Sequence, residues 1–173
     1  HERLVGSEMC IRDRLRLKSW LETLDGYGLK PVTILHGNWD AQSGYAGALQ
    51  MLRETPNFSA VLVGNDQMAL GVLSAFHQHQ VAVPGEKSVI GYDDTYESSF
   101  FYPALSTVSL DLDLQGKEAV RRILASTSGA SHTSSILPAR LVIRHSSGAR
   151  VEEGKDLQAI AEQLRAIAHR LAP

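Results

Sequence analysis

The polar step Asn65-Asp66-Gln67 carries side chains that could bind a small polar molecule. It directly follows the apolar run 59–63, and the amides of Asn65 and Gln67 both donate and accept hydrogen bonds. That combination suits the hydroxyl groups of a sugar. The simpler alternative is that Asn65 caps the helix that begins here, and its residue type alone favours this capping role.

Two consecutive carboxylates, Asp93 and Asp94, close the apolar segment 88–92. They could cap a turn, accept hydrogen bonds from hydroxyl groups, or bind magnesium. Consecutive residues of a strand point to opposite faces, so only one of the pair can face a given crevice. This favours Asp93 as a single acceptor. A magnesium-dependent phosphotransfer enzyme that uses both residues with Asp66 is the alternative from another class of function.

An aromatic residue and two cations complete the candidate chemistry. Trp39 follows the apolar segment 31–35. A tryptophan there is usually part of a core, but its flat face also suits the C–H face of a pyranose ring. Arg14 and Arg16 are expected in the first turn of a helix, where a cation opposes the macrodipole. A ligand or carboxylate partner would explain that placement, and a surface ion pair is the simpler reading for either arginine.

Other kinds of site find little support. His77 and His79 would face away from each other on a helix, which argues against a metal site. Cys10 is the only cysteine, so the sequence favours a reducing compartment over a disulfide framework. The sequence has no nucleophile elbow, phosphate loop or dinucleotide fingerprint. We therefore predict a protein that is not an enzyme and needs no metal or cofactor.

Short apolar runs alternate with helical patterns, which predicts βαβ units and an α/β fold with a parallel sheet. The predicted strands are 31–35, 59–63, 88–92, 105–112 and 136–143. Trp39, Asn65 and Asp93 each follow one of the first three strands. Open α/β sheets bind ligands at the carboxyl ends of their strands, so we expect these side chains to gather at one edge.

The totals fit one globular domain. Apolar residues make up 43% of the 173 residues and charged residues 21%, and the net charge of −2 gives no reason to expect nucleic-acid binding by this segment. No apolar run approaches the roughly 20 residues that span a bilayer, and the N-terminus does not resemble a signal peptide. A cytoplasmic protein without a membrane partner is expected.

The C-terminal residues carry a different pattern. The polar stretch 146–155 predicts a linker. Apolar residues then recur at spacings of three and four, which forms a two-heptad seam. They are Leu157, Ile160, Leu164, Ile167 and Leu171. We predict an oligomerisation helix over 156–172.

Four segments together are characteristic of a known family. Residues 61–70, 89–95, 103–108 and 14–20 resemble the LacI/GalR family of transcriptional regulators. The resemblance runs from Arg14 to the C-terminus. It implies a type I periplasmic-binding-protein-like fold with sugar held between two subdomains.

The resemblance also implies specific roles. Arg16, Trp39, Asn65, Gln67 and Asp93 would contact a small sugar or glycoside inducer. The C-terminal helix would form tetramers, as a dimer of dimers, which agrees with the heptad pattern. Operator DNA would be bound by a helix-turn-helix headpiece that is not within these residues, and sugar would shift the protein towards a state that does not fit the operator.

The same resemblance predicts the domain organisation. Residues 1–111 and 136–147 would form the C-terminal effector-binding subdomain, 112–135 a remnant crossover segment of the N-terminal subdomain, 146–155 the linker and 156–172 the oligomerisation helix. A sugar-transport binding protein is the nearest alternative because it shares the fold. The heptad pattern argues against it, since transport receptors generally act as monomers.

Overall fold

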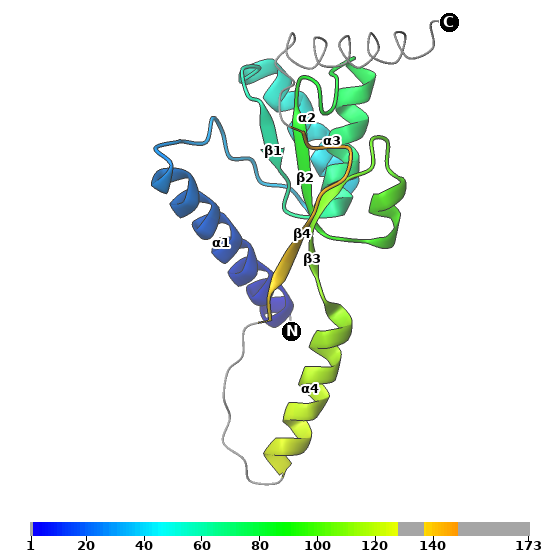
Figure 1. Cartoon of the computed structure of the whole chain (residues 1–173). Coiled ribbons are helices and arrows are strands. Elements are labelled where there is room, and N and C mark those ends of the chain that lie inside the picture. Colours follow the sequence, from blue (N-terminus) through cyan, green and yellow to red (C-terminus); the bar gives the residue numbers. More distant parts are fainter. Residues whose placement is uncertain (1, 128–136, 149–173) are drawn as a thin grey trace, which may run out of the picture.

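The computed structural model describes residues 2–127 and 137–148 of the chain (Figure 1). In chain order the elements are α1 (Glu2–Gly26), α2 (Ala41–Glu54), β1 (Ala60–Leu62), α3 (Asp66–Gln78), β2 (Ser88–Asp93), the 3-10 helix η1 (Tyr96–Phe100), β3 (Ser106–Leu110), α4 (Leu112–Thr127) and β4 (Ala139–Val142). The predicted α/β class and the strands at β1, β2, β3 and β4 are confirmed. The predicted oligomerisation residues lie outside the described residues.

One sheet has the strand order β1-β2-β3-β4. The first three strands are parallel, with Val61 opposite Val89 and Ile90 opposite Ser106. Strand β4 instead runs antiparallel to β3, with Leu141 opposite Val108. The sheet is therefore mixed, whereas the sequence predicted a parallel one. The difference arises because α4 leaves from the carboxyl end of β3, and β4 runs back from that side (Figure 1).

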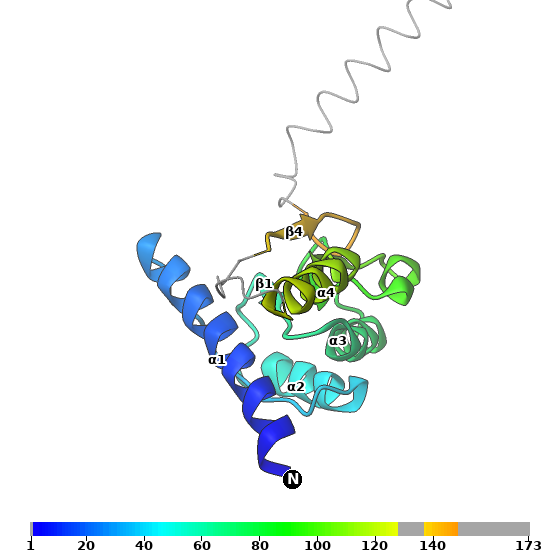
Figure 2. The same cartoon turned by 90° about the horizontal axis from the view of Figure 1, so that it is seen from below.

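Helices α2 and α3 lie side by side and provide most of the core (Figure 2). Two glycines allow their backbones to approach closely. A Cβ atom at Gly71 would overlap the Ala41 carbonyl, and one at Gly44 would overlap the Met68 carbonyl. The side chains of Phe76, Val89 and Leu105 are completely buried between this helix pair and the sheet.

Helix α1 is longer at its N-terminal end than the sequence suggested. It begins at Glu2, so Arg14 and Arg16 lie near its middle and not in its first turn. The macrodipole acts within the terminal turns of a helix, so it does not explain these arginines. That part of the prediction is wrong, and any partner of Arg16 must come from tertiary structure.

The predicted strand 31–35 is not formed. The segment has no assigned strand, and its side chains Val32 and Ile34 are 58% and 41% exposed. A strand needs a hydrogen-bonded neighbour, and β1 pairs only with β2 within the described sheet. The segment instead leads from α1 towards α2. Residues 37–39, which follow it, reach the carboxyl edge of the sheet (the edge at which β1, β2 and β3 end).

The start of the predicted linker is also different. Ser146 is fully buried. Its hydroxyl donates to the Val89 carbonyl at 2.6 Å and accepts from the Ser106 amide at 2.8 Å. A buried hydroxyl group needs hydrogen-bond partners, and Ser146 finds them on the backbones of β2 and β3. Ser146 is therefore packed against the sheet and is not part of a linker. Residues 149–155 lie outside the described part.

Helix α4 projects away from the sheet and the α2–α3 pair (Figure 1). Its apolar side chains Val120, Ile123 and Leu124 are 58%, 64% and 62% exposed. The assignment of residues 112–135 to a remnant crossover segment of the N-terminal subdomain stays a prediction. None of the described helices is long and apolar enough to cross a membrane.

Candidate ligand-binding site

Arg16 connects α1 to the carboxyl edge of the sheet. Its Nη1 atom donates to the Gly64 carbonyl at 3.0 Å, just beyond β1. Its Nη2 atom lies 3.7 Å from the Oδ1 atom of Asp93, the last residue of β2. The guanidinium group also stacks over the Tyr92 ring, 3.7 Å from the ring centroid. Arg16 and Asp93, predicted separately from distant segments, are thus brought together.

The Asn65 side chain makes two hydrogen bonds at the start of α3. Its Oδ1 atom accepts from the Met68 amide at 2.8 Å, so the capping role is confirmed. Its Nδ2 atom donates to the Trp39 carbonyl at 2.9 Å. Trp39 has a positive φ of 68°, a conformation that needs support in a residue other than glycine. The buried Asn65 amide therefore fixes the backbone that carries Trp39 at the carboxyl edge.

Gln67 and Arg14 are both exposed. Gln67 is exposed in the first turn of α3, and no hydrogen bond of its side chain is found within the described residues. It is accessible to a ligand next to Asn65. Arg14 is exposed on α1, two residues before Arg16.

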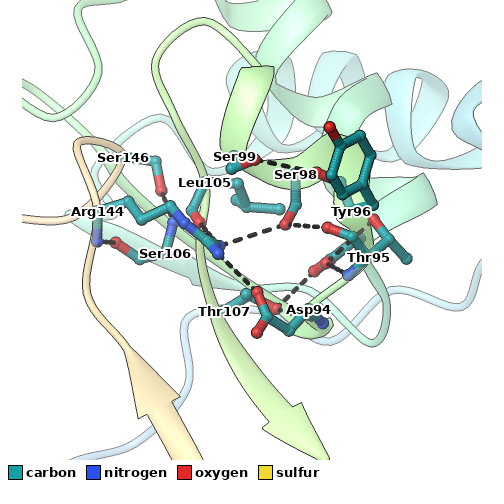
Figure 3. A network of polar contacts seen from close by, with 11 residues as sticks. Asp94, Thr95, Tyr96, Ser98, Ser99, Leu105, Ser106, Thr107, Arg144 and Ser146 are labelled. Carbon is teal, nitrogen blue, oxygen red and sulfur yellow. Dashed lines mark hydrogen bonds and ion pairs between the residues drawn. The ribbon is translucent and has the colours of Figure 1, made fainter.

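Asp93 and Asp94 point in different directions, but strand alternation is not the cause, because neither residue has the φ of a strand conformation. Asp93 faces Arg16 and its side chain is 41% exposed. Asp94 instead forms an ion pair with Arg144, whose Nη2 atom lies 2.7 Å from its Oδ1 atom (Figure 3). Both aspartates have positive φ values, 114° and 57°. Only Asp93 is therefore accessible at the Arg16 side.

The environment of Asp94 lowers the pKa of its carboxyl group. Partial burial raises this pKa, but hydrogen bonds from Arg144 and Ser109 and the charges of Arg144 and Arg140 outweigh the burial. Asp94 is thus held as an anion by groups of the protein itself.

Asp66, which was considered as a magnesium ligand, has an internal role. It is fully buried, and its Oδ1 atom accepts from the Thr107 hydroxyl at 2.6 Å. Its Oδ2 atom accepts from the Thr95 amide at 2.9 Å. Among residues 2–127 and 137–148 there is no group of three or more His, Cys, Asp or Glu residues that could hold a metal ion.

Sequence reasoning missed two groups at this edge, the Gly64 carbonyl and the Tyr92 ring. It also missed Arg144, which lies beside Leu105 at the start of β3 and contacts Asp94. Tyr92 stands beside Asp93, but alternation along the strand placed it on the opposite face. The positive φ of Asp93 breaks that alternation, which lets Arg16 contact both residues. The left-handed turn at Asp93 and Asp94 contains no glycine, so the residue types give no clear sign of it.

Comparison with known proteins agrees with this architecture. The sequence profile of the periplasmic binding protein-like domain matches residues 5–147. The chain therefore belongs to the periplasmic binding protein-like domain family.

Proteins with similar sequences identify a narrower group within this family. The chain is 41% identical to the lactose operon repressor of Klebsiella pneumoniae over 97% of its own length and 48% of that protein. It is 35% identical to the lactose operon repressor of Escherichia coli (strain K12), over 98% of this chain and 47% of that protein. The resemblance to LacI/GalR regulators is thus confirmed. The chain spans about half the length of these relatives.

Solved structures give the same result. The crystal structure of the lac repressor dimer bound to operator and the anti-inducer ONPF superposes with a TM-score of 0.75 at 39% identity. The alignment covers 79% of this chain and 48% of that chain. The predicted periplasmic-binding-protein-like fold is therefore confirmed at the level of tertiary structure.

Proposed function

We propose that this chain is the effector-sensing part of a transcriptional regulator and binds a small neutral sugar or glycoside. The site would be formed at the carboxyl edge by the five side chains named from the sequence: Arg16, Trp39, Asn65, Gln67 and Asp93. The observation that carries the proposal is the approach of Arg16 to Asp93, at 3.7 Å. The positively charged donor Arg16 and the negatively charged acceptor Asp93 then lie together, and their charges cancel, so the site carries no net charge.

A neutral pair of this kind favours a polyol over an ionic ligand. The Asp93 carboxylate accepts hydrogen bonds from hydroxyl groups, and the Arg16 guanidinium donates to hydroxyl or ring oxygens. An anionic ligand such as a sugar phosphate would be repelled by the Asp93 carboxylate. Arg16 neutralises that carboxylate and leaves no excess positive charge for a phosphate group. Trp39, half-buried at the same edge, offers an apolar face for the ring.

The relatives support regulation over transport. Both reported relatives are named as repressors of the lactose operon, so galactosides such as lactose are the first ligands to test. In this proposal operator DNA is bound by a headpiece that is not within these residues, and the regulator acts in the cytoplasm. Sugar binding shifts the population towards a state with low operator affinity.

The test is titration calorimetry on the complete gene product as the cell makes it. We expect heat of binding with lactose or another neutral mono- or disaccharide, no binding of glucose 6-phosphate, and release of operator DNA at the same sugar concentrations. Binding of the sugar phosphate in preference to every neutral sugar would contradict the proposed ligand class. Sugar binding without any effect on DNA would favour a transport receptor.

We further propose that the seam Leu157, Ile160, Leu164, Ile167 and Leu171 assembles the intact protein into a dimer of dimers. Burial of such side chains contributes roughly 1.5–3 kcal/mol each. Replacing Leu164 and Ile167 by aspartate should reduce the mass measured by light scattering from tetramer to dimer, while sugar affinity per subunit stays nearly constant. An unchanged mass would contradict the role of this seam.

A further inference from the structure

Arg144 is the hub of a polar network next to the candidate site (Figure 3). It follows β4, and its Nη1 atom donates to the Leu105 carbonyl at 2.8 Å and to the Ser98 hydroxyl at 3.2 Å. Its Nη2 atom donates to Asp94 at 2.7 Å. One side chain therefore connects the end of β4, the start of β3, helix η1 and the turn after β2.

The turn that Arg144 holds is conformationally demanding. Asp93 and Asp94 are consecutive and both have φ values in the left-handed half of the Ramachandran plot, 114° and 57°. Residues with a Cβ atom rarely adopt such values, and they persist only where surrounding structure determines them. The direction of the Asp93 side chain depends on this turn, because an ordinary strand conformation would continue the alternation of β2.

The opposite side of the turn is fixed by a separate group. The buried Asp66 accepts from the Thr95 amide at 2.9 Å and from the Thr107 hydroxyl at 2.6 Å. Thr107 in turn accepts from the Asp94 amide at 3.4 Å. These contacts fix the backbone at residues 94 and 95. The Asp94 carboxylate itself is held by Arg144 and by a hydrogen bond from Ser109.

We propose that Arg144 is a positioning residue for the ligand site. By holding the Asp94 carboxylate, it keeps the turn in the conformation that directs Asp93 towards Arg16. Arg144 contacts Asp94, Leu105 and Ser98, and its influence on a ligand would pass through Asp94 and Asp93. The guanidinium shape is needed because its separate nitrogens serve Asp94 and the Leu105 carbonyl at once, which a lysine ammonium cannot reproduce with the same geometry.

A direct test needs no ligand. The ring current of Tyr92 should displace the NMR resonances of the Arg16 guanidinium, since the two groups are 3.7 Å apart. In Arg144→Lys we expect these resonances to move towards the values of an exposed arginine. Arg53→Lys is the matched control, because Arg53 is exposed on α2, pairs with Glu54 and keeps its charge in the variant. It should leave the Arg16 resonances unchanged.

The second readout rests on the proposed function. Arg144→Lys should weaken sugar binding about tenfold, within the range of coupling between residues of one network. Asp93→Asn should weaken it as well. If Arg144 acts through Asp93, the double variant should bind as weakly as Asp93→Asn alone. A role of Arg144 in general stability would instead add its full effect in the double variant.

The outcomes separate the two proposals. Arg16 resonances that match the wild type in Arg144→Lys would overturn the positioning role, whatever the sugar affinity. Moved resonances in a protein that binds no sugar would support the positioning role and refute the proposed function. If Arg144→Lys does not fold, Asp94→Asn carries the same test, because it removes the charge that Arg144 holds while keeping the side-chain shape.

Discussion

The Nη2 atom of Arg16 lies 3.7 Å from the Oδ1 atom of Asp93 and links helix α1 to the end of strand β2. The two residues are far apart in sequence, and Arg16 also donates to the Gly64 carbonyl after β1. The candidate site therefore depends on the docking of α1 against the carboxyl edge. Without it, Asp93 would lose its contact with Arg16.

Replacing Asp93 by asparagine should weaken sugar binding while the fold stays intact. A charge-assisted hydrogen bond contributes roughly 1.5–3 kcal/mol, which corresponds to about a tenfold to hundredfold loss in affinity. Titration calorimetry measures the affinity, and the exposed Asp25→Asn on α1 is the control. Equal affinity of Asp93→Asn and wild type would remove Asp93 from the site.

Trp39 fluorescence should report sugar binding, because Trp39 is half-buried and its backbone is held by Asn65 at the carboxyl edge. The chain has two tryptophans, and Trp20 lies on α1. We expect the sugar-induced change to vanish in Trp39→Phe and to persist in Trp20→Phe. The reverse result would mean that the two tryptophans have been assigned the wrong way round.

Asn65→Asp should separate capping from tethering. Aspartate still caps α3 by accepting from the Met68 amide, but it cannot donate to the Trp39 carbonyl. We expect weaker sugar binding and a smaller loss of stability than in Asn65→Ala, which also loses a cap worth about 1 kcal/mol. Thermal unfolding and calorimetry measure the two effects. Sugar affinity equal to wild type in Asn65→Asp would show that the tether does not matter.

Gly71→Ala should destabilise the protein strongly, since the added methyl group would overlap the Ala41 carbonyl between α2 and α3. Overpacking of this kind costs about 1–3 kcal/mol or more. Gly116→Ala on α4 has open space around it and should be neutral or stabilising by roughly 0.5–1 kcal/mol. Urea unfolding compares them, and similar stabilities would refute the close packing of α2 on α3.

The Asp94–Arg144 pair should make stability sensitive to acid. The folded protein holds the pKa of Asp94 below its ordinary value, so the pair stabilises the fold above the unfolded pKa. This contribution is lost as the pH falls below about 4 and through the folded pKa. Asp94→Asn should therefore lose less stability on acidification than wild type in urea unfolding. Asp113→Asn, exposed on α4, should behave like wild type.

The local elements of this fold could be predicted because their signals are local. Apolar runs marked β1, β2 and β3, and the residue types at Asp40 and Asn65 marked the starts of α2 and α3, where both side chains accept a hydrogen bond from the helix backbone. The carboxyl-edge positions of Asn65 and Asp93 followed from the parallel arrangement of these strands. Residues 31–35 have the same apolar character but form no strand, since strand formation depends on a neighbour that local sequence does not reveal.

The residues by themselves determined the α/β class, the helix caps and the set of polar side chains available for binding, since each depends on propensity and periodicity along the chain. Only the tertiary structure decided that Arg16 meets Asp93, that Asn65 holds Trp39, and that Arg144 holds Asp94. These contacts join distant segments, and each of the three involves a residue with positive φ: Asp93, Trp39 or Asp94. Such conformations are imposed by the surrounding packing and hydrogen bonds, so no pattern of neighbouring residues could have predicted them.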